Sequence, residues 1–255
     1  FENVLKKISK VKNNEMIGES PRKFESPLVI IDPIDRNRNL GAAISIQNVT
    51  NFILIARNFL KKSSLSYFKE KSKDKIPAEL AKNTLVVNFK YKKRSDDIIY
   101  GQIKRAATSI ESQMTKEGFN VLRSDAVAYD ESKASLLFLL ESLTISKNEI
   151  RTGPDVFSGD FSTKFIEINS KKSKLMWADK DGKLQSLQTR RYENAKSYLT
   201  DLIKNHIGES GIPKGLRTDF KNGFKIANGK DKQNKSVKKS ISKMITTDDT
   251  TFSAN

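Results

Sequence analysis

The side chains that could do chemistry in this chain are mainly carboxylates, hydroxyls and lysines. Its 255 residues include no cysteine and a single histidine, His206. The lack of cysteine excludes a disulfide framework, a thiol nucleophile, cysteine-ligated zinc and iron–sulfur clusters, and it fits a reducing, cytoplasmic setting. With one histidine, histidine-clustered metal sites and most Ser/His/Asp triads are excluded as well. The range of catalysis open to the chain is therefore narrow.

The nearest approach to a metal-binding pair is in the segment DPIDRNRN, which contains Asp32 and Asp35. These carboxylates are three residues apart around a turn, whereas two on the same face of a strand would be two apart. The alternative is an Asp-Pro turn whose carboxylates accept hydrogen bonds from local amides and hold Arg36 and Arg38. We therefore expect no metal site here.

Arg38 is the best candidate for a nucleotide contact. It follows a short apolar strand and precedes small residues, and an arginine held by carboxylates presents a fixed fork of donors to a base edge or a phosphate. A structural salt bridge explains the same spacing equally well. Neither G-x-G-x-x-G nor G-x-x-x-x-G-K-[ST] occurs, so the known glycine-rich phosphate loops are absent.

The charge balance points to a polyanionic partner. Lysine and arginine number 47 against 30 acidic residues, which gives a net charge of +17 and favours nucleic acid. Two clusters of basic and aromatic residues suit phosphate contacts with base stacking, although each could also be a solvated face on which lysine stems cover apolar surface. Their basic members are Lys90, Lys92, Lys93, Arg94, Arg190 and Arg191.

A membrane partner is not expected. No apolar run approaches the roughly 20 residues that span a bilayer, and no segment cleanly shows a basic amphipathic helix with bulky apolar residues opposite its basic face. The chain begins at Phe1, within a predicted helix, so we expect its start to be internal to a longer protein.

The elements that must position these residues follow from apolar spacing. The N-terminal part predicts a helix at 1–12, a strand at 28–31 that ends before Pro33, and a helix capped by Ser45 that ends near Lys62. A charged, exposed loop is expected at 69–75. The next region predicts strand, helix, strand and strand at 84–91, 96–117, 119–129 and 134–143.

This β-α-β-β order is typical of an RNA-recognition sheet, but the aromatic signature of that fold is missing, so base stacking on the sheet face is only weakly indicated. Further along, a hairpin is expected around Asp181-Gly182 and a last helix at 190–206. Residues 230–255 contain few apolar residues and are expected to be disordered.

Several motifs, taken in order, resemble the archaeal (class I) CCA-adding enzymes, the tRNA nucleotidyltransferases. The loop DPIDRNRNLGAA at 32–43 is similar to the family's D-P-V-D-P-x-R-N-V-A-A, with Arg36 and Gly41 in place of the usual proline and alanine. The similarity extends over roughly residues 1–207 through Phe52, Arg57, SLSYF at 64–68, GQIKR at 101–105, GFNVLRSD at 118–125, Glu131-Ser132, LLFLLES at 136–142, Gly153-Pro154 and RRY at 190–192. The order of the motifs makes it specific.

Pattern and resemblance together imply an α+β fold in four parts. Residues 1–70 would be the end of a helical central domain, and 83–150 a ferredoxin/RRM-like β-α-β-β body. Residues 151–207 would form a small α+β tail domain with the last helix, and 208–255 a basic, largely disordered C-terminus.

The resemblance also implies the tRNA-binding C-terminal part of an enzyme that adds C, C and A from CTP and ATP to the tRNA 3′ end without a nucleic-acid template. Mg²⁺ and the catalytic carboxylates would belong to a preceding head domain, so we expect no catalytic residue here and no nucleotide addition by this chain alone. Arg38 would contact the nucleotide. Lys104 and Arg105 join the candidates for contact with the acceptor stem and TΨC loop, and a homodimer stays open.

Two alternatives remain at this point. The chain could be a stand-alone basic RNA-binding module without catalytic activity, which would need no relation to tRNA. It could also be a protein-interaction domain whose basicity is incidental, in which case partner binding would be independent of salt.

Overall fold

The computed structural model describes residues 1–42, 44–68 and 76–252, and the chain divides into two compact units. The first unit comprises Phe1–Lys73 together with Thr246–Asn255, and the second comprises Asp74–Ile245. Ala43 of the loop motif, the predicted charged loop at 69–75 and the last three residues lie outside the described part.

The first unit is built around helix α2 (Ile46–Lys61), which packs against α1 (Glu2–Ile8) and α9 (Asp249–Phe252). Strands β1 (Glu15–Ile17) and β2 (Leu28–Ile30) pair in parallel, and the 3-10 helix η1 (Leu65–Phe68) follows α2. The predicted cap of α2 is confirmed, because the Ser45 side chain accepts a hydrogen bond from the Asn48 amide at 3.2 Å. Asn58 of α2 donates to the carbonyls of Thr250 and Thr251, which fixes α9 to this helix.

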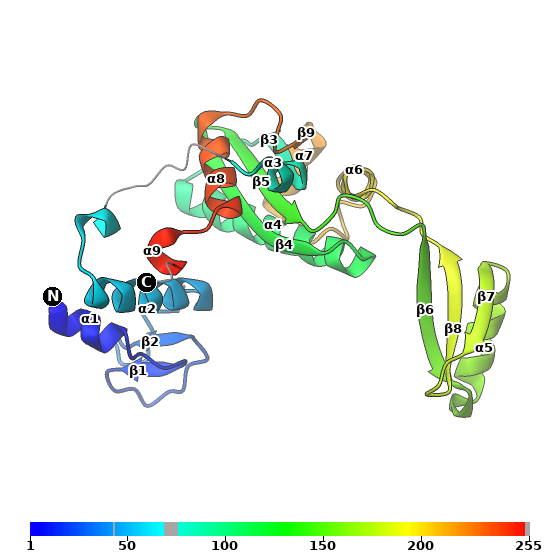
Figure 1. Ribbon diagram of the computed structural model, residues 1–255, viewed down its shortest axis with the longest axis horizontal. Helices are drawn as coiled ribbons and strands as arrows, with labels where there is room; N and C mark the ends of the chain where they lie inside the picture. Colours follow the sequence, from blue (N-terminus) through cyan, green and yellow to red (C-terminus); the bar gives the residue numbers. More distant parts are fainter. Residues whose placement is uncertain (43, 69–75, 253–255) are drawn as a thin grey trace. The chain divides into compact units, whose positions relative to one another are not determined.

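The second unit contains a four-stranded antiparallel sheet (Figure 1). Its strands are β3 (Thr84–Lys90), β4 (Val121–Tyr129), β5 (Lys133–Leu140) and β9 (Phe224–Asn228), in the order β4-β5-β3-β9. Its helices are α3 (Ala78–Lys82), α4 (Asp96–Glu117), α6 (Ala195–Asn205), α7 (Lys214–Lys221) and α8 (Lys235–Ile245). The predicted ferredoxin/RRM-like β-α-β-β body is confirmed, and β9 completes it.

Both faces of this sheet are covered by helices. On one face, Val87 and Phe89 pack against α4, α6 and α7, and Phe89 stacks on Phe220 with ring centroids 4.1 Å apart. On the other face, Val86 and Leu137 are buried with the apolar residues of α8. The alternation of side chains along β3 supplies both cores. Because neither face is open, the sheet offers no platform for base stacking.

A second, three-stranded sheet lies between β5 and α6 in the sequence. It has the order β6-β8-β7, from strands Asn148–Asp155, Lys183–Thr189 and Ser173–Ala178, and carries η2 (Val156–Ser158) and α5 (Asp160–Ser170). The hairpin predicted around Asp181-Gly182 is confirmed, since β7 and β8 pair across this turn and Gly182 has a φ of +75°.

Two predictions are wrong. Residues 208–255 are not largely disordered: 214–252 contain α7, β9, α8 and α9, because most of their few apolar residues fall on faces that are buried in the fold. The last helix begins at Ala195 rather than at 190, because Asn194 caps it by accepting from the amides of Lys196 and Ser197.

Candidate nucleic-acid interface

The DPIDRNRN segment is a turn whose carboxylates bond to nearby amides. Oδ1 of Asp32 accepts from the Ile34 amide, and Oδ1 of Asp35 accepts from the Asn37 amide, each at 2.9 Å. The turn interpretation is therefore confirmed for both residues. Across the residues that the structure describes, there is no group of three or more His, Cys, Asp or Glu side chains that could hold a metal ion.

Arg38 projects from this turn toward solvent. Its side chain is 68% exposed, and Nη1 lies 3.7 Å from Oδ2 of Asp32, a loose ion pair. The next residue, Asn39, fixes the turn to β2: its Oδ1 accepts from the amides of Ile30 and Gly41 at 2.9 and 2.8 Å. A Cβ at Gly41 would lie 2.5 Å from the Leu28 carbonyl oxygen, so the close return of the chain requires glycine there. The backbone of the turn is thus fixed, while the Arg38 guanidinium is exposed and could contact a ligand.

Arg94, a candidate RNA contact, bonds to other groups of the protein through its guanidinium. Its guanidinium contacts Oδ2 of Asp219 at 2.5 Å and the side chain of Gln102 at 2.8 Å. It also donates to the carbonyls of Lys92 and Gly215 at 2.9 and 2.8 Å. Asp219 is almost fully buried and accepts from the Lys92 amide as well. This arginine therefore joins the β3–α4 loop to α7.

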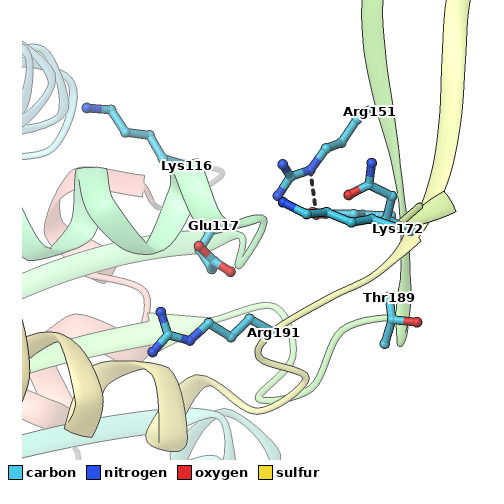
Figure 2. A pocket seen from close by; sticks show the side chains of 8 residues that line it. Lys116, Glu117, Arg151, Lys172, Thr189 and Arg191 are labelled. Atoms are coloured by element: carbon cyan, nitrogen blue, oxygen red, sulfur yellow. Dashed lines mark hydrogen bonds and ion pairs between the residues drawn. The ribbon is translucent and has the colours of Figure 1, made fainter. Parts of the chain in front are cut away.

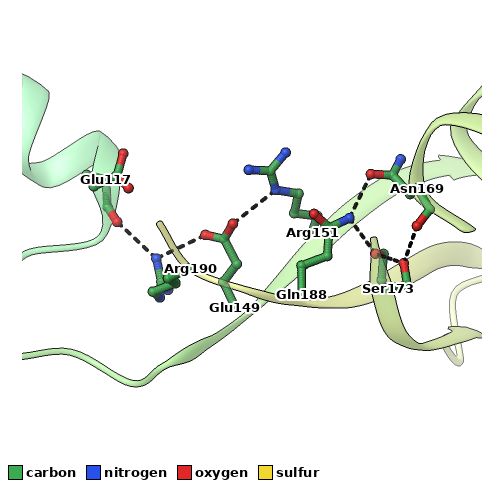
Figure 3. Close-up of polar contacts among 8 residues, drawn as sticks. Glu117, Glu149, Arg151, Asn169, Ser173, Gln188 and Arg190 are labelled. Atoms are coloured by element: carbon green, nitrogen blue, oxygen red, sulfur yellow. Dashed lines mark hydrogen bonds and ion pairs between the residues drawn. The ribbon is translucent and has the colours of Figure 1, made fainter. Parts of the chain in front are cut away.

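Arg190 likewise has a structural position (Figure 3). Its Nη1 donates to the Glu117 carbonyl at 2.9 Å and to Oε2 of Glu149 at 3.0 Å, while Nε is buried without a partner. The guanidinium lies at the C-terminal end of α4, where a cation interacts favourably with the helix dipole. It also packs on Gly118, whose Cβ would lie 2.9 Å from Nη1. Arg190 thus fastens the end of β8 to the end of α4.

Next to Arg190 lies a cavity of about 520 Å³ with a basic lining (Figure 2). We call it the basic pocket; its cationic residues are Lys116, Arg151, Lys172 and Arg191, and its acidic residues are Glu117 and Glu149. Arg191 lies over the ring of Tyr192 at 5.1 Å from its centroid and 3.6 Å from Asp201.

The basic pocket carries four cationic and two acidic side chains, so its net charge is positive. Glu149 is paired with Arg151 and Arg190, each at 3.0 Å. Burial, followed by the charge of Glu149, raises the pKa of Glu117 above its ordinary value, because both disfavour a second carboxylate charge. The pocket as a whole therefore favours an anion.

Of the cationic residues in this pocket, Arg191 alone belongs to a basic cluster of the sequence, and Lys116, Arg151 and Lys172 were not predicted. These three come from α4, β6 and the residues after α5, so no local motif joins them. Only the tertiary fold brings them together.

The remaining candidates are exposed. Lys90, Lys92 and Lys93 lie at or just after the end of β3, and Lys104 and Arg105 lie on the outer side of α4. Lys93 pairs with Glu131 at 3.3 Å, but both side chains are more than three-quarters exposed, so the pair adds little stability.

The family described as CCA-adding enzyme, C-terminal domain, matches residues 81–229, and the family described as tRNA nucleotidyltransferase, second domain, matches residues 1–69. The chain belongs to the CCA-adding enzyme family.

Curated relatives named CCA-adding enzyme support the assignment, and the resemblance inferred from the motifs is confirmed. The protein from Pyrobaculum islandicum is 30% identical over 192 residues, which is 75% of this chain and 44% of the relative. The protein from Saccharolobus shibatae is 34% identical over 201 residues, or 77% and 47%, and that from Pyrobaculum neutrophilum 35% identical over 149 residues, or 58% and 35%. The chain thus spans less than half the length of these relatives.

The CCA-adding family matches divide in the same place as the structure. The second-domain match lies in the first unit and includes Arg38, whereas the C-terminal-domain match covers both sheets and the basic pocket. Helices α8 and α9 lie beyond both matched ranges. In the described residues, no helix is long and apolar enough to cross a membrane.

Proposed function

We propose that this chain is the tRNA-holding C-terminal part of a CCA-adding nucleotidyltransferase, which extends the tRNA 3′ end by C, C and A from CTP and ATP without a nucleic-acid template. The observation that carries the proposal is the pair of family matches, a second domain and a C-terminal domain, in order along one chain. A stand-alone RNA-binding module is not favoured, since it would not account for both matches.

The basic pocket would hold the RNA backbone. Its lysines, Lys116 and Lys172, are exposed and flank one cavity, where they can meet phosphate oxygens. Double-stranded RNA is recognised largely by shape through phosphate and 2′-hydroxyl contacts, so the acceptor stem and TΨC loop of tRNA suit this kind of surface. Arg94 and Arg190 would support the surface from within instead of contacting RNA.

Arg38 would contact the base of the incoming CTP or ATP. Its backbone is fixed by the Asn39 bonds to β2, while its guanidinium is mostly exposed and only loosely paired. In an enzyme that contains all of the family's domains, Arg38→Ala should impair selection of CTP and ATP and leave tRNA affinity nearly unchanged. An equal loss of tRNA affinity would make Arg38 a phosphate contact.

Nucleotide addition by the whole enzyme would be phosphoryl transfer, in which the tRNA 3′-hydroxyl gives up its proton, attacks the α-phosphate of CTP or ATP and displaces pyrophosphate. Mg²⁺ would supply electrostatic stabilisation of the developing negative charge. The described residues contain no cluster of three or more potential metal ligands. We therefore assign no catalytic step to this chain and expect it alone to add no nucleotide. Incorporation of labelled CMP by the purified chain would contradict this.

Binding to a tRNA acceptor/TΨC minihelix and to an RNA hairpin of equal length and charge tests the proposal. We expect the minihelix to be preferred at two salt concentrations, because shape recognition survives screening better than the net charge does. Lys116→Gln with Lys172→Gln should reduce this preference, whereas Lys61→Gln with Lys62→Gln, which removes the same charge from the first unit, should not. Equal binding of both RNAs, lost together at high salt, would refute tRNA recognition. Sedimentation of the free chain would show whether it forms a homodimer.

A further inference from the structure

A second basic surface lies on the C-terminal segment that the family matches do not cover. Residues 224–245 contain one acidic residue, Asp231, and seven lysines, all exposed. We call these lysines the C-terminal lysine face; they are Lys225, Lys230, Lys232, Lys235, Lys238, Lys239 and Lys243. Six of the seven lie beyond residue 229, where the C-terminal-domain match ends.

Helix α8 holds this face in a fixed position. Its apolar residues Val237 and Ile241 are fully buried, and Met244 and Ile245 nearly so, against the sheet face formed by β3, β5 and β9. Arg123 of β4 donates to the Met244 carbonyl and secures the C-terminal end of the helix. Since four lysines of α8 recur at spacings of three and four residues, they share the side opposite to this apolar stripe.

Three lysines of the face carry positive charge that no acidic side chain in the described part of the chain balances. Asp231 is engaged in the turn before α8, where its Oδ2 accepts from the Asn228 amide at 2.7 Å. Among the described residues, Lys232, Lys235 and Lys238 form no ion pair with an acidic side chain. Neighbouring like charges without acidic partners attract a polyanion with a strong dependence on salt.

We propose that the C-terminal lysine face is an additional binding surface for the RNA phosphate backbone, separate from the basic pocket and independent of RNA sequence. This inference rests on the proposed tRNA-binding function. An anionic membrane does not fit, because the apolar side of α8 is buried in the protein and nothing is left to insert between lipids. Base stacking does not fit either, because α8 covers the sheet face on which bases would stack.

The test compares the full chain with Lys232→Gln, Lys235→Gln and Lys238→Gln combined. The control is Lys10→Gln, Lys12→Gln and Lys23→Gln, which removes three exposed charges from the first unit. Affinity for the minihelix and for the matched hairpin is measured between 0.05 and 1 M salt. Three lost phosphate contacts on a duplex should reduce the log–log salt slope by about 2.7. If the binding curves of the two proteins meet at 1 M salt, this corresponds to roughly 500-fold weaker binding of the variant near 0.1 M.

We expect the loss to be equal for the two RNAs, unlike the loss caused by the pocket variant, and we expect bound RNA to protect these lysines from acylation in the unmodified chain. If the variant with Lys232, Lys235 and Lys238 replaced keeps the slope and affinity of the control while the unmodified chain still prefers the minihelix, this inference fails and the proposed function stands. If the unmodified chain shows no preference for the minihelix, the proposed function fails. A lower salt slope in the variant with Lys232, Lys235 and Lys238 replaced, but not in the control, would still support a phosphate-binding face.

Discussion

Replacing Arg94 offers the sharpest separation of a structural role from an RNA-binding role. Its side chain is 18% exposed and that of Asp219 5%, and together they join the β3–α4 loop to α7. In Arg94→Ala the Asp219 carboxylate stays buried without its cation. Breaking a buried ion pair from one side costs about 3–5 kcal/mol of folding free energy. For a unit of this size we therefore expect the melting temperature to fall by about 10 °C.

Two companion variants refine the test. Arg94→Lys keeps the charge but cannot reach Gln102, Gly215 and Asp219 simultaneously, so it should recover only part of the lost stability. Arg94→Ala combined with Asp219→Asn removes the unpaired charge, and its loss should be smaller than the sum of the single losses.

The assay is urea unfolding followed by circular dichroism, with RNA affinity measured well below the melting temperature. We expect all three variants to bind the minihelix within a few-fold of the unmodified chain. A variant of unchanged stability that bound RNA more than tenfold weaker would refute the structural role and indicate that Arg94 contacts an RNA phosphate.

Four further outcomes follow from the structure. Arg190→Ala should lower stability in urea unfolding without lowering the log–log salt slope of RNA binding, since its guanidinium is engaged with α4. Gly118→Ala should cost about 1–3 kcal/mol in the same assay, because φ is +103° and the new methyl would meet the guanidinium. A hydrogen bond from Tyr192 lowers the pKa of the Asp201 carboxyl, so the ionised carboxylate stabilises the fold at neutral pH. This stabilisation is lost as the pH falls below about 4. The difference in free energy of unfolding between the unmodified chain and Asp201→Asn should therefore vanish at low pH. Ser45→Ala should cost the first unit about 1 kcal/mol, measured by thermal unfolding, through loss of the α2 cap.

Local patterns predicted most of the regular elements because their signals lie within short stretches. The apolar stripe of α4 and the Gly118 stop locate a helix whose bounds, Asp96–Glu117, match the prediction. The helices and the strand of the C-terminal segment were not predicted, because the average composition of this segment is polar. Only the spacing of Val237, Ile241, Met244 and Ile245 reveals an amphipathic helix. The pairing of β9 with β3 joins residues far apart in the chain, which no local pattern encodes.

The candidate site was less predictable, since exposure depends on distant partners. Lys92 and Arg94 belong to the same basic cluster in the sequence. Only the Arg94 side chain is largely buried, because it pairs with Asp219 of α7. The basic pocket shows the converse, in which residues without a shared motif converge on one cavity.

Arginine and lysine are used differently in this chain, and the difference bears on how it would bind RNA. Five arginines donate to main-chain carbonyls in loops and at helix ends: Arg57, Arg94, Arg123, Arg190 and Arg217. A planar fork can satisfy several such acceptors together, whereas a lysine presents a single strongly hydrated charge. The exposed cations left over are mainly lysines, and they include those of the basic pocket and of α8. Binding through them should depend steeply on salt, so discrimination of tRNA must come from where the fold places these charges and not from their number.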